Sequence, residues 1–507
     1  MKILFATSEA HPFVKTGGLA DVSGSLPNAL AGLKHKVKLV LPAYRSILDK
    51  LDSKKVIKKV AELTVGGCGK HFHVNILRVK AGAVDGVDVP VLLVDIPELF
   101  DRSGSPYLAD DGTDWWDNGE RFGVFSKVVT ELAMNRVGLK WQPDVVHTND
   151  WQTGLVSALL SLELEPPKTI FTVHNMAYPG NFPKSLFEQL ELPWNIWEQE
   201  GVEYYGNFSM LKAGLMLSDC VTTVSPTYAK EICSPEFAYG FEGVLQKRSA
   251  EGCLIGIING IDEQVWNPEI DELIFKKYSA HKGRVIGKHR NKEALLNGMD
   301  FIKYISDQAQ KEALVARWLR EPLIGFVGRL VSQKGVDLIL EVLPDLLVES
   351  AANFIFVGSG DKAYELELRQ YAKQYPDRIW VHTGYSESLA HQVEAGADMF
   401  LMPSRFEPCG LNQMYSLAYG TPPVVHHTGG LADTVVNATE ENLKQGLATG
   451  FVFYDPSRFA LKSTLLHALF LFGKKRTWQK MQKTGMEQPL GWDISAKQYI
   501  KLYAEKR

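Results

Sequence analysis

The feature that most constrains the fold is a repeated rhythm of short apolar runs, each followed by a turn and an amphipathic, helix-like stretch. In the first half of the chain these runs cover residues 37–41, 91–94, 168–173 and 220–224. The rhythm restarts in the second half, with runs at residues 323–327, 354–357, 379–381, 399–402 and 423–425. Strands that alternate with helical stretches are typical of parallel sheets with helical crossovers. The sequence therefore predicts an α/β protein with two doubly wound, Rossmann-like units.

The boundary between the two units is predicted near residue 262. A strand-like run at residues 254–258 leads into Asn259-Gly260-Ile261-Asp262, which is a strong turn signal, and Trp266-Asn267-Pro268 then interrupts regular structure. A chain of 507 residues exceeds what one hydrophobic core usually organises. We therefore expect one domain at residues 1–262 and a second at residues 263–490.

Composition excludes several classes of protein. The formal net charge is only -4 and the basic residues are scattered, which disfavours nucleic acid or an anionic membrane as a partner. The five cysteines lie far apart without Cys-x-x-Cys spacing, so neither a disulfide framework nor a zinc site is expected. The chain enters a strand-like run at residues 2–7 without a targeting segment, and it has no apolar run long enough to span a bilayer. These features favour a cytoplasmic protein.

One short turn occurs twice, once in each half of the chain. Residues 15–21, Lys-Thr-Gly-Gly-Leu-Ala-Asp, resemble residues 427–433, His-Thr-Gly-Gly-Leu-Ala-Asp. The first copy follows the opening strand, where open α/β sheets bind ligands. Its paired glycines let the backbone approach a phosphate or sugar closely, and Lys15 adds a positive charge. The pattern suits a diphosphate, although paired glycines can also form a tight strand-to-helix turn alone.

Two cations follow the first strand of the second half. Arg329 can form a planar, bidentate contact with phosphate oxygens, and Lys334 supplies a flexible point charge. Together they could neutralise a diphosphate leaving group. The alternative is a pair of solvated surface charges.

A carboxylate follows the run at residues 399–402. Glu407 at this position can accept hydrogen bonds from sugar hydroxyls. The amides of Gly410, Leu411 and Asn412 could bind a phosphate if a helix begins there. A lone glutamate near a helix start is more often a surface residue, so position is the argument for Glu407.

Two histidines and several aromatic residues lie near strand ends of the first half. Either His147 or His174 could donate to a sugar hydroxyl or to charge developing at the reaction centre, or could instead be structural, and we favour His174. Trp151 offers an apolar face for a pyranose ring, and Tyr107 belongs to a loop that mixes aromatic and acidic residues, as acceptor sites for carbohydrate do.

No Asp-x-Asp occurs in the chain, so a metal-dependent mechanism is not expected.

These motifs together resemble the bacterial glycogen synthases and the catalytic core of plant starch synthases, in order along essentially the whole chain. The resemblance implies a GT-B fold, in which two Rossmann-like domains face each other across a cleft and residues 491–507 form a helix that returns to the first domain. It also implies a retaining transfer of glucose from ADP-glucose to the non-reducing 4-hydroxyl of an α-1,4-glucan such as glycogen, with release of ADP and without a cofactor. In the family's mechanism the leaving diphosphate takes the proton of the attacking hydroxyl.

The resemblance also implies roles for individual residues. The catalytic residues would be Glu407, His174, Arg329 and Lys334. The donor would be bound by Lys15, Gly17, Gly18, Asp21, Arg329, Lys334, Tyr385, Glu407, Gly410, Leu411, Thr428 and Gly429. The acceptor would be bound by Tyr107, Asp150, Trp151 and Asn175.

Three details refine this expectation. Tyr385 matches the position where the family stacks a tyrosine on adenine. The wider retaining GT-B class has a second glutamate eight residues after Glu407, whereas this chain has Tyr415, so the ribose contact is left unassigned. The second turn has His427 in place of Lys15, and we expect it to line the nucleotide pocket with backbone amides.

Other functions stay open at this stage. The donor could be UDP-glucose, or the protein could hydrolyse or epimerise a sugar nucleotide without an acceptor. A non-enzymatic glycan-binding or regulatory protein could also keep this fold. The sequence does not determine the oligomeric state, the preferred primer length or any allosteric regulation.

Overall fold

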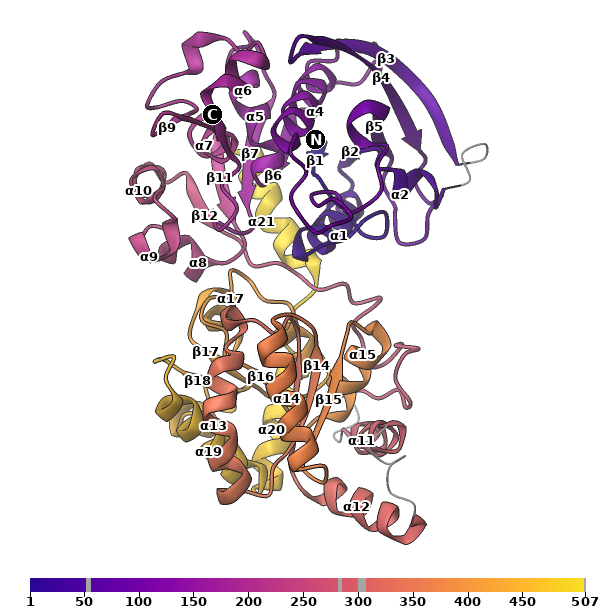
Figure 1. The fold of residues 1–507 in the computed structure, drawn as a ribbon, viewed down its shortest axis with the longest axis vertical. Coiled ribbons are helices and arrows are strands. Elements are labelled where there is room, and N and C mark those ends of the chain that lie inside the picture. The colour runs from indigo at the N-terminus through magenta and orange to yellow at the C-terminus, as the bar shows by residue number, and fades with distance from the viewer. Residues whose placement is uncertain (52–55, 281–284, 300–306, 506–507) are drawn as a thin grey trace. The chain divides into compact units, whose positions relative to one another are not determined.

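The structure is a computed structural model that describes residues 1–51, 56–280, 285–299 and 307–505. The chain divides into two compact units (Figure 1). Unit 1 consists of Met1–Gly260 together with Trp492–Arg507, and unit 2 consists of Ile261–Gly491. The predicted boundary at residue 262 is close to the point where unit 1 first ends.

Unit 1 is built on a mixed sheet in which most neighbouring strands are parallel. Its strands are β1 (Lys2–Ala6), β2 (Lys36–Pro42), β3 (Ile57–Gly67), β4 (Lys70–Val79), β5 (Val91–Asp95), β6 (Val145–Asn149), β7 (Lys168–Val173), β11 (Cys220–Thr223) and β12 (Leu254–Gly256). Within the described ranges these nine strands are ordered β12-β11-β7-β6-β1-β2-β5-β4-β3. A small antiparallel sheet, β8-β10-β9, is formed by β8 (Asn181–Pro183), β9 (Glu203–Tyr204) and β10 (Asn207–Ser209).

The helices of unit 1 include the crossovers between its parallel strands. They are α1 (Gly18–Gly32), α2 (Arg45–Leu48), α3 (Pro97–Phe100), α4 (Asn118–Ala133), α5 (Trp151–Leu160), α6 (Lys184–Gln189), η1 (Trp194–Ile196), α7 (Met210–Leu217), α8 (Pro226–Glu231), α9 (Pro235–Ala238), α10 (Glu242–Ala250) and α21 (Trp492–Ala504). The helix α5 packs against both α4 and α7, and α1 packs against α21. The last helix of the chain is therefore part of unit 1.

The hairpin β3–β4 was not predicted from the sequence. The two strands pair antiparallel and extend the sheet at its β5 edge. Cys68 and Gly69 connect them with φ angles of 55° and 68°, as a two-residue turn with positive φ at both positions requires. The strands have one exposed face, so their apolar residues alternate with polar ones and do not form a continuous run.

Unit 2 contains a parallel sheet. Its strands are β13 (Leu323–Val327), β14 (Asn353–Gly358), β15 (Ile379–Thr383), β16 (Met399–Met402), β17 (Pro423–His426) and β18 (Phe451–Phe453). Within the described part of the chain these six strands have the order β15-β14-β13-β16-β17-β18. The prediction of two sheets with helical crossovers is thus confirmed.

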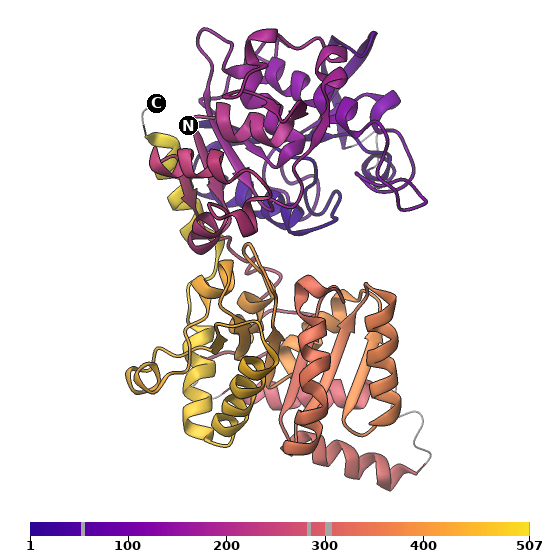
Figure 2. The same cartoon turned by 60° about the vertical axis from the view of Figure 1, so that its left-hand side comes forward.

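The helices of unit 2 lie on either side of this sheet (Figure 2). They are α11 (Ile286–Gly298), α12 (Gln308–Arg320), η3 (Ser332–Lys334), α13 (Val336–Glu349), α14 (Lys362–Gln374), α15 (Glu387–Gly396), α16 (Asn412–Ala418), α17 (Gly429–Thr434), α18 (Glu440–Gln445), α19 (Arg458–Phe472) and α20 (Lys475–Met486). Within the described ranges of the whole chain, every helix is too short or too polar to cross a membrane.

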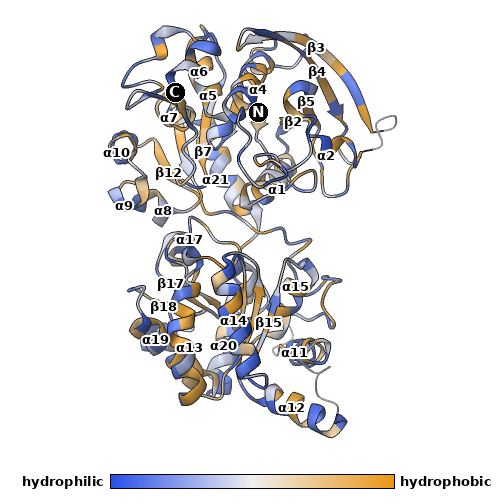
Figure 3. Ribbon diagram, in the orientation of Figure 1, coloured by the Kyte–Doolittle hydropathy of each residue, from blue (hydrophilic) through white to orange (hydrophobic). Residues whose placement is uncertain are grey.

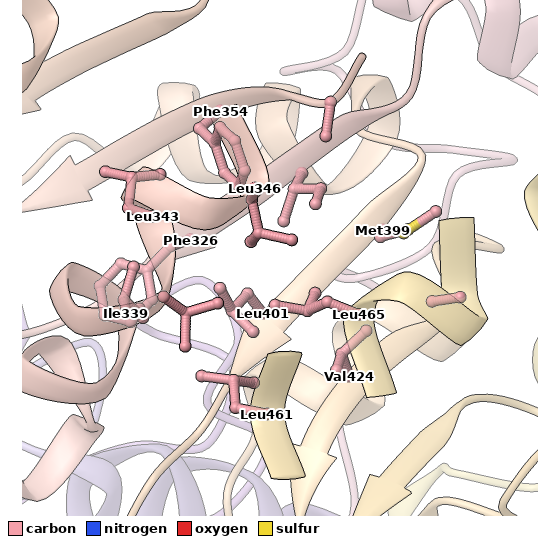
Figure 4. Packing of buried hydrophobic residues seen from close by; sticks show 14 of the residues in the cluster. Phe326, Ile339, Leu343, Leu346, Phe354, Met399, Leu401, Val424, Leu461 and Leu465 are labelled. Carbon is pink, nitrogen blue, oxygen red and sulfur yellow. The ribbon is translucent and has the colours of Figure 1, made fainter. Parts of the chain in front are cut away.

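The core of unit 2 explains why its strands contain apolar runs in the sequence. Along β14, Phe354 and Phe356 pack with side chains of α13 and α19, whereas Ile355 and Val357 pack on the opposite face with α11 and α15. Figure 4 shows the first of these clusters, and Figure 3 shows hydrophobic residues concentrated along the strands. Because helices cover both faces, successive residues in the middle of the strand are apolar. Replacing Phe354 by alanine would cost about 3–5 kcal/mol.

Hydrogen bonds connect the helix α21 to the rest of unit 1. Tyr503 Oη lies 2.6 Å from His147 Nδ1, and Ser495 Oγ donates to the carbonyl oxygen of Ile258 at 2.6 Å. Lys168 Nζ donates to the carbonyl oxygens of Leu502 at 2.7 Å and Glu505 at 2.8 Å. The ammonium thus satisfies carbonyl groups that the end of a helix leaves without intrahelical partners.

Candidate active site

The first glycine turn, residues 15–18, leads from the segment after β1 into α1. Lys15 Nζ donates to Asp21 Oδ1 at 2.7 Å, and both side chains are partly exposed. A Cβ atom placed on Gly17 or Gly18 would meet no atom within 4 Å. The backbone of this turn therefore faces open space, as close contact with a ligand requires.

A buried carboxylate that was not predicted from the sequence supports this turn. The Oε2 atom of Glu9 accepts the backbone N–H of Thr16 at 2.5 Å and the hydroxyl of Thr16 at 2.8 Å. Burial raises the pKa of Glu9, and the hydrogen bonds from Thr16 and from the backbone of Gly17 only partly offset this effect. The available sequence signal was a glutamate directly after Thr7 and Ser8, at the end of a buried strand.

Asp150 and His174 come together because each follows one of two neighbouring strands, β6 and β7. Asp150 Oδ1 accepts the backbone N–H of His174 at 2.7 Å. Burial raises the pKa of Asp150 to about 7, and the charge of Glu9 acts in the same direction. The φ angle of Asp150 is 55°, which few residues other than glycine adopt. Such strained conformations cluster at functional sites.

His174 is neutral, and Asn149 determines its tautomer. Burial lowers the pKa of His174 to about 3. Asn149 Nδ2 donates to the carbonyl oxygen of Ala6 at 3.0 Å, so Asn149 Oδ1 is the acceptor that lies 3.0 Å from His174 Nε2. The proton is therefore on Nε2, and Nδ1 can only accept. This corrects the expectation that His174 donates to a sugar or to developing charge: through Nδ1 it would accept from a sugar hydroxyl.

The other strand-end histidine, His147, is structural. It is fully buried, and its two ring nitrogens lie 2.6 Å from Tyr503 Oη and 2.6 Å from Thr172 Oγ1. Burial lowers the pKa of His147 to about 3. With both nitrogens bonded inside unit 1, His147 has none for a substrate.

Trp151 does not offer a face to a sugar. Only 8% of the residue is exposed, and its ring packs against Phe122 and Phe182. A Cβ atom on Gly180 would lie 2.6 Å from the Trp151 ring, so the backbone of that glycine covers the ring directly. The expectation that Trp151 binds the acceptor is therefore wrong, because the side chain at the start of α5 turns into the core.

The remaining predicted acceptor residues lie near this cluster. Tyr107 Oη lies 2.7 Å from Ser8 Oγ, and burial raises the pKa of Tyr107 well above its usual range, as do the charges of Glu9 and Asp150. Asn175 uses its Oδ1 to accept the backbone N–H of Ala177 at 3.0 Å. Tyr107, Glu9 and Asp150 thus form one electrostatically coupled group.

In unit 2 the predicted carboxylate and one predicted cation form an ion pair. Lys334 Nζ donates to Glu407 Oε2 at 2.5 Å, and Ser404 Oγ donates to the same oxygen at 3.1 Å. Arg329 donates to Gln333 Oε1 at 2.8 Å. Lys334 and Glu407 meet because β13 and β16 are neighbours and each residue follows the carboxyl end of one of them. Arg329 is connected to the same loop through Gln333, whose Nε2 donates to the carbonyl oxygen of Phe406 at 3.4 Å.

The second glycine turn is closed, unlike the first. A Cβ atom on Gly429 would lie 2.0 Å from the carbonyl oxygen of Glu407, and one on Gly430 would lie 2.0 Å from that of Cys409. The N–H of Gly430 bonds to the carbonyl oxygens of Glu407 and Pro408, both at 3.2 Å, and the N–H of Thr428 bonds to that of His426 at 2.9 Å. These amides are used within the protein, so the expectation that the turn offers them to a nucleotide is wrong at Thr428. Through these hydrogen bonds the turn stabilises the loop that contains Glu407.

The helix α16 begins where a phosphate-binding helix was predicted. Gly410, with a φ angle of 70°, and Leu411 immediately precede its first residue, Asn412. Tyr415 lies on this helix, but its ring is stacked 3.7 Å from the ring of Trp266, so Tyr415 contributes to packing. Tyr385 follows β15 and is 78% exposed, which leaves its ring accessible to a base.

Metal ligands are not grouped at either turn. Within the residues that the structure describes, no three His, Cys, Asp or Glu side chains are arranged so that they could hold a metal ion.

Comparisons with known proteins identify the family of this chain. Residues 2–247 match the family described as the starch synthase catalytic domain, and residues 307–470 match glycosyl transferases group 1. The glycogen synthase of Hydrogenovibrio crunogenus is 64% identical over 504 residues, covering 99% of each chain. The chain belongs to the glycogen synthase family. A second family member, from Thioalkalivibrio sulfidiphilus, is 46% identical and covers 100% of this chain and 99% of its own.

Solved structures extend the family assignment to the fold. The catalytic domain of starch synthase IV from Arabidopsis thaliana, bound to ADP and acarbose, is 29% identical and has a TM-score of 0.82, covering 99% of this chain and 98% of its own. A sucrose-phosphate synthase from Thermosynechococcus elongatus is similar in fold alone, with 16% identity and a TM-score of 0.57. The predicted GT-B fold and glycosyltransferase class are confirmed.

Proposed function

We propose that this chain elongates α-1,4-glucan by transferring glucose from ADP-glucose to the non-reducing 4-hydroxyl with retention of configuration, releasing ADP. The observation that carries the proposal is the ion pair between Lys334 and Glu407, in a member of the glycogen synthase family. A diphosphate needs fixed cations, and a sugar needs hydrogen-bond acceptors, at neighbouring positions. Unit 2 supplies both at the ends of adjacent strands.

The chemistry requires no protein nucleophile. The oxygen of the acceptor 4-hydroxyl forms a bond to the anomeric carbon of glucose while the bond from that carbon to the diphosphate oxygen breaks on the same face. The proton of the hydroxyl passes to the leaving diphosphate. Arg329 and Lys334 would stabilise the negative charge that develops on the diphosphate, and Glu407 would hold the glucose hydroxyls.

The residues of unit 1 are assigned to the same reaction by this proposal. Lys15, with the open backbone of Gly17 and Gly18, would contact the donor. Asp21 bonds Lys15 at 2.7 Å and would orient its ammonium. His174 would accept a hydrogen bond from a glucose hydroxyl through Nδ1.

Three further assignments complete the proposed donor and acceptor sites. Tyr385 would stack on adenine, since its ring is exposed. Gly410 and Leu411 would bring backbone amides to the donor phosphate at the start of α16. Tyr107, Asp150 and Asn175 would contact the acceptor glucan.

We also propose that the domain division follows these roles. Residues 1–262 would bind the acceptor and carry the Lys15 turn, residues 263–490 would bind the sugar nucleotide, and residues 491–507 would act as part of the first domain. The cellular compartment would be the cytoplasm, where a reducing environment suits five free cysteines.

The experiment is incorporation of radiolabelled glucose into a glycogen primer from ADP-glucose and, in parallel, from UDP-glucose. We expect chain extension with ADP-glucose at the higher kcat/KM and α-linkages in the product. Faster extension with UDP-glucose would reassign the donor, and free glucose without extension would indicate a hydrolase. Glycan binding without turnover of either donor would overturn the enzymatic proposal.

A further inference from the structure

Glu9 occupies a position that no donor or acceptor role assigned above explains. It lies beyond the end of β1, is only 3% exposed, and carries a carboxylate into the interior of unit 1. A buried carboxylate is costly unless it is hydrogen-bonded. The carboxylate accepts an N–H and a hydroxyl from Thr16 and is also hydrogen-bonded by the backbone of Gly17.

Thr16 is the one residue with a side chain between Lys15 and Leu19, because the other two are glycines. The open space around Gly17 and Gly18 means that no neighbouring side chain packs on the turn from that direction. A turn with two adjacent glycines has a high conformational entropy when it is free. The pair of bonds between Thr16 and Glu9 therefore restrains a segment that would otherwise be poorly determined.

The segment that carries Glu9 is itself held firmly. Thr7 Oγ1 donates to the carbonyl oxygen of Glu9 at 2.9 Å and lies 2.9 Å from Ser23 Oγ on α1. Tyr44 Oη donates to the carbonyl oxygen of Ser8 at 2.9 Å. A residue on a loop needs a rigid support of this kind if it is to contact a ligand in an accurate position.

The second turn shows the contrast. There the backbone carbonyl of Glu407 accepts the N–H of Gly430, and the glycines lie directly against the supporting loop. In the first turn a side-chain carboxylate provides the support through the backbone of Thr16 and Gly17, and the Cβ directions of both glycines face open space. The two copies are thus held by a glutamate in different ways, and of the two only the first has open space beside its glycines.

We propose that Glu9 is a positioning residue that acts through Thr16, holding the turn of residues 15–18 in the conformation that contacts the diphosphate of the sugar nucleotide. This inference rests on the proposed function. Burial and the negative charge of Asp21 both raise the pKa of Glu9, which agrees with a carboxylate directed toward Thr16 and away from solvent.

The test is a double-mutant cycle on full-length protein with the variants Glu9→Ala and Thr16→Val. The affinity for ADP is measured by calorimetry, and kcat and KM are measured for ADP-glucose and for glycogen. Each single variant should weaken ADP binding and raise the KM for ADP-glucose at least tenfold, with the KM for glycogen unchanged. The double variant should be no worse than Glu9→Ala alone, because Glu9→Ala already removes the bond that Thr16→Val deletes.

Conservative variants separate positioning from a direct role of the charge. In Glu9→Gln the carboxamide oxygen can still accept both the N–H and the hydroxyl of Thr16, and Thr16→Ser keeps both donors. Both should restore most of the affinity for ADP. If Glu9→Gln is as defective as Glu9→Ala while Thr16→Ser and Thr16→Val bind ADP normally, the charge of Glu9 acts directly and the inference is overturned.

The chain contains a matched control. Asp219 Oδ2 accepts the N–H of Thr169 at 2.7 Å and its hydroxyl at 3.0 Å, which repeats the Glu9–Thr16 arrangement at the start of β7. Thr169→Val should lower the thermal stability without changing the affinity for ADP. Unchanged ADP affinity in the Glu9→Ala and Thr16→Val variants of an enzyme that elongates glycogen would overturn this inference alone. A wild-type protein that neither binds ADP nor elongates glycogen would overturn the proposed function as well.

Discussion

Lys334 Nζ and Glu407 Oε2 are 2.5 Å apart, so the cation proposed for the diphosphate and the carboxylate proposed for the sugar are one ion pair. Only 21% of the lysine side chain and 10% of the glutamate side chain are exposed. In such surroundings each charge depends on the other, because removing one partner leaves the second without compensation. The pair therefore links the two halves of the proposed donor site, the phosphate contact and the sugar contact.

Removing either member of this pair should therefore greatly reduce turnover. Lys334→Ala and Glu407→Ala should each lower kcat with ADP-glucose by well over tenfold, which corresponds to at least about 1.4 kcal/mol of transition-state stabilisation. The double variant should lose less than the product of the two single effects. Lys444→Ala is the control, since Lys444 forms a 2.6 Å pair with Glu440 in which both side chains are mostly exposed. Near-wild-type rates in both single variants would contradict the assignment.

The two glycine turns should respond oppositely to the same substitution. Gly17→Ala adds a methyl group where no protein atom lies within 4 Å, so it should leave the melting temperature unchanged and raise the KM for ADP-glucose. Gly430→Ala adds one 2.0 Å from the carbonyl oxygen of Cys409, and overpacking of this kind costs about 1–3 kcal/mol. Thermal unfolding combined with donor kinetics checks both expectations. A destabilised Gly17→Ala protein would show that the first turn is not open.

The two strand-end histidines should separate activity from stability. Tyr503→Phe leaves His147 Nδ1 without its buried partner, so it should lower the free energy of unfolding by about 1–3 kcal/mol while kcat and KM stay unchanged. His174→Ala should reduce kcat at least tenfold with a smaller effect on stability. Chemical denaturation and steady-state kinetics on both variants provide the measurement. An inactive but stable Tyr503→Phe protein would reverse the two roles.

Asp150 should make the stability of the protein depend on pH. Its pKa is raised from an ordinary value of 3.8 to about 7 by burial, so between these values the folded state binds the proton more tightly than the unfolded state. Stability due to this group is therefore lost as the pH rises from about 4 to about 7. Asp150→Asn removes this titration. The unfolding free energy of the variant minus that of the wild type should therefore be about 1–3 kcal/mol more positive at pH 8 than at pH 5.

The control for this pH dependence is Asp111→Asn. Hydrogen bonds from Thr113 lower the pKa of Asp111, so its stabilising contribution is present above its ordinary pKa and is lost only as the pH falls. This variant should gain no stability at pH 8. Denaturant titrations at the two pH values give the comparison, and an Asp150→Asn protein with the same stability difference at both would contradict the prediction.

Much of the fold could be predicted from the sequence because of how its sheets are buried. The strands of unit 2 have helices on both faces, so each contains a short apolar run that can be recognised locally. The hairpin β3–β4 escaped prediction because its strands have one exposed face and carry many polar residues. Candidate site residues were found for a related reason: polar residues that directly follow buried strands lie at the edge of a parallel sheet where ligands bind.

Sequence by itself determined which residue types stand at the strand ends, and the tertiary structure decided which of them face a ligand. His147 and His174 both end strands, but His147 meets Tyr503, which is 356 residues away along the chain, and is thereby enclosed. Trp151 is covered by Gly180 and its aromatic neighbours, whereas Glu9 is brought to Thr16 by a turn that the sequence marks only by its glycines. The physical reason is that propensity and burial pattern are local, whereas the direction of a side chain depends on distant segments that pack against it.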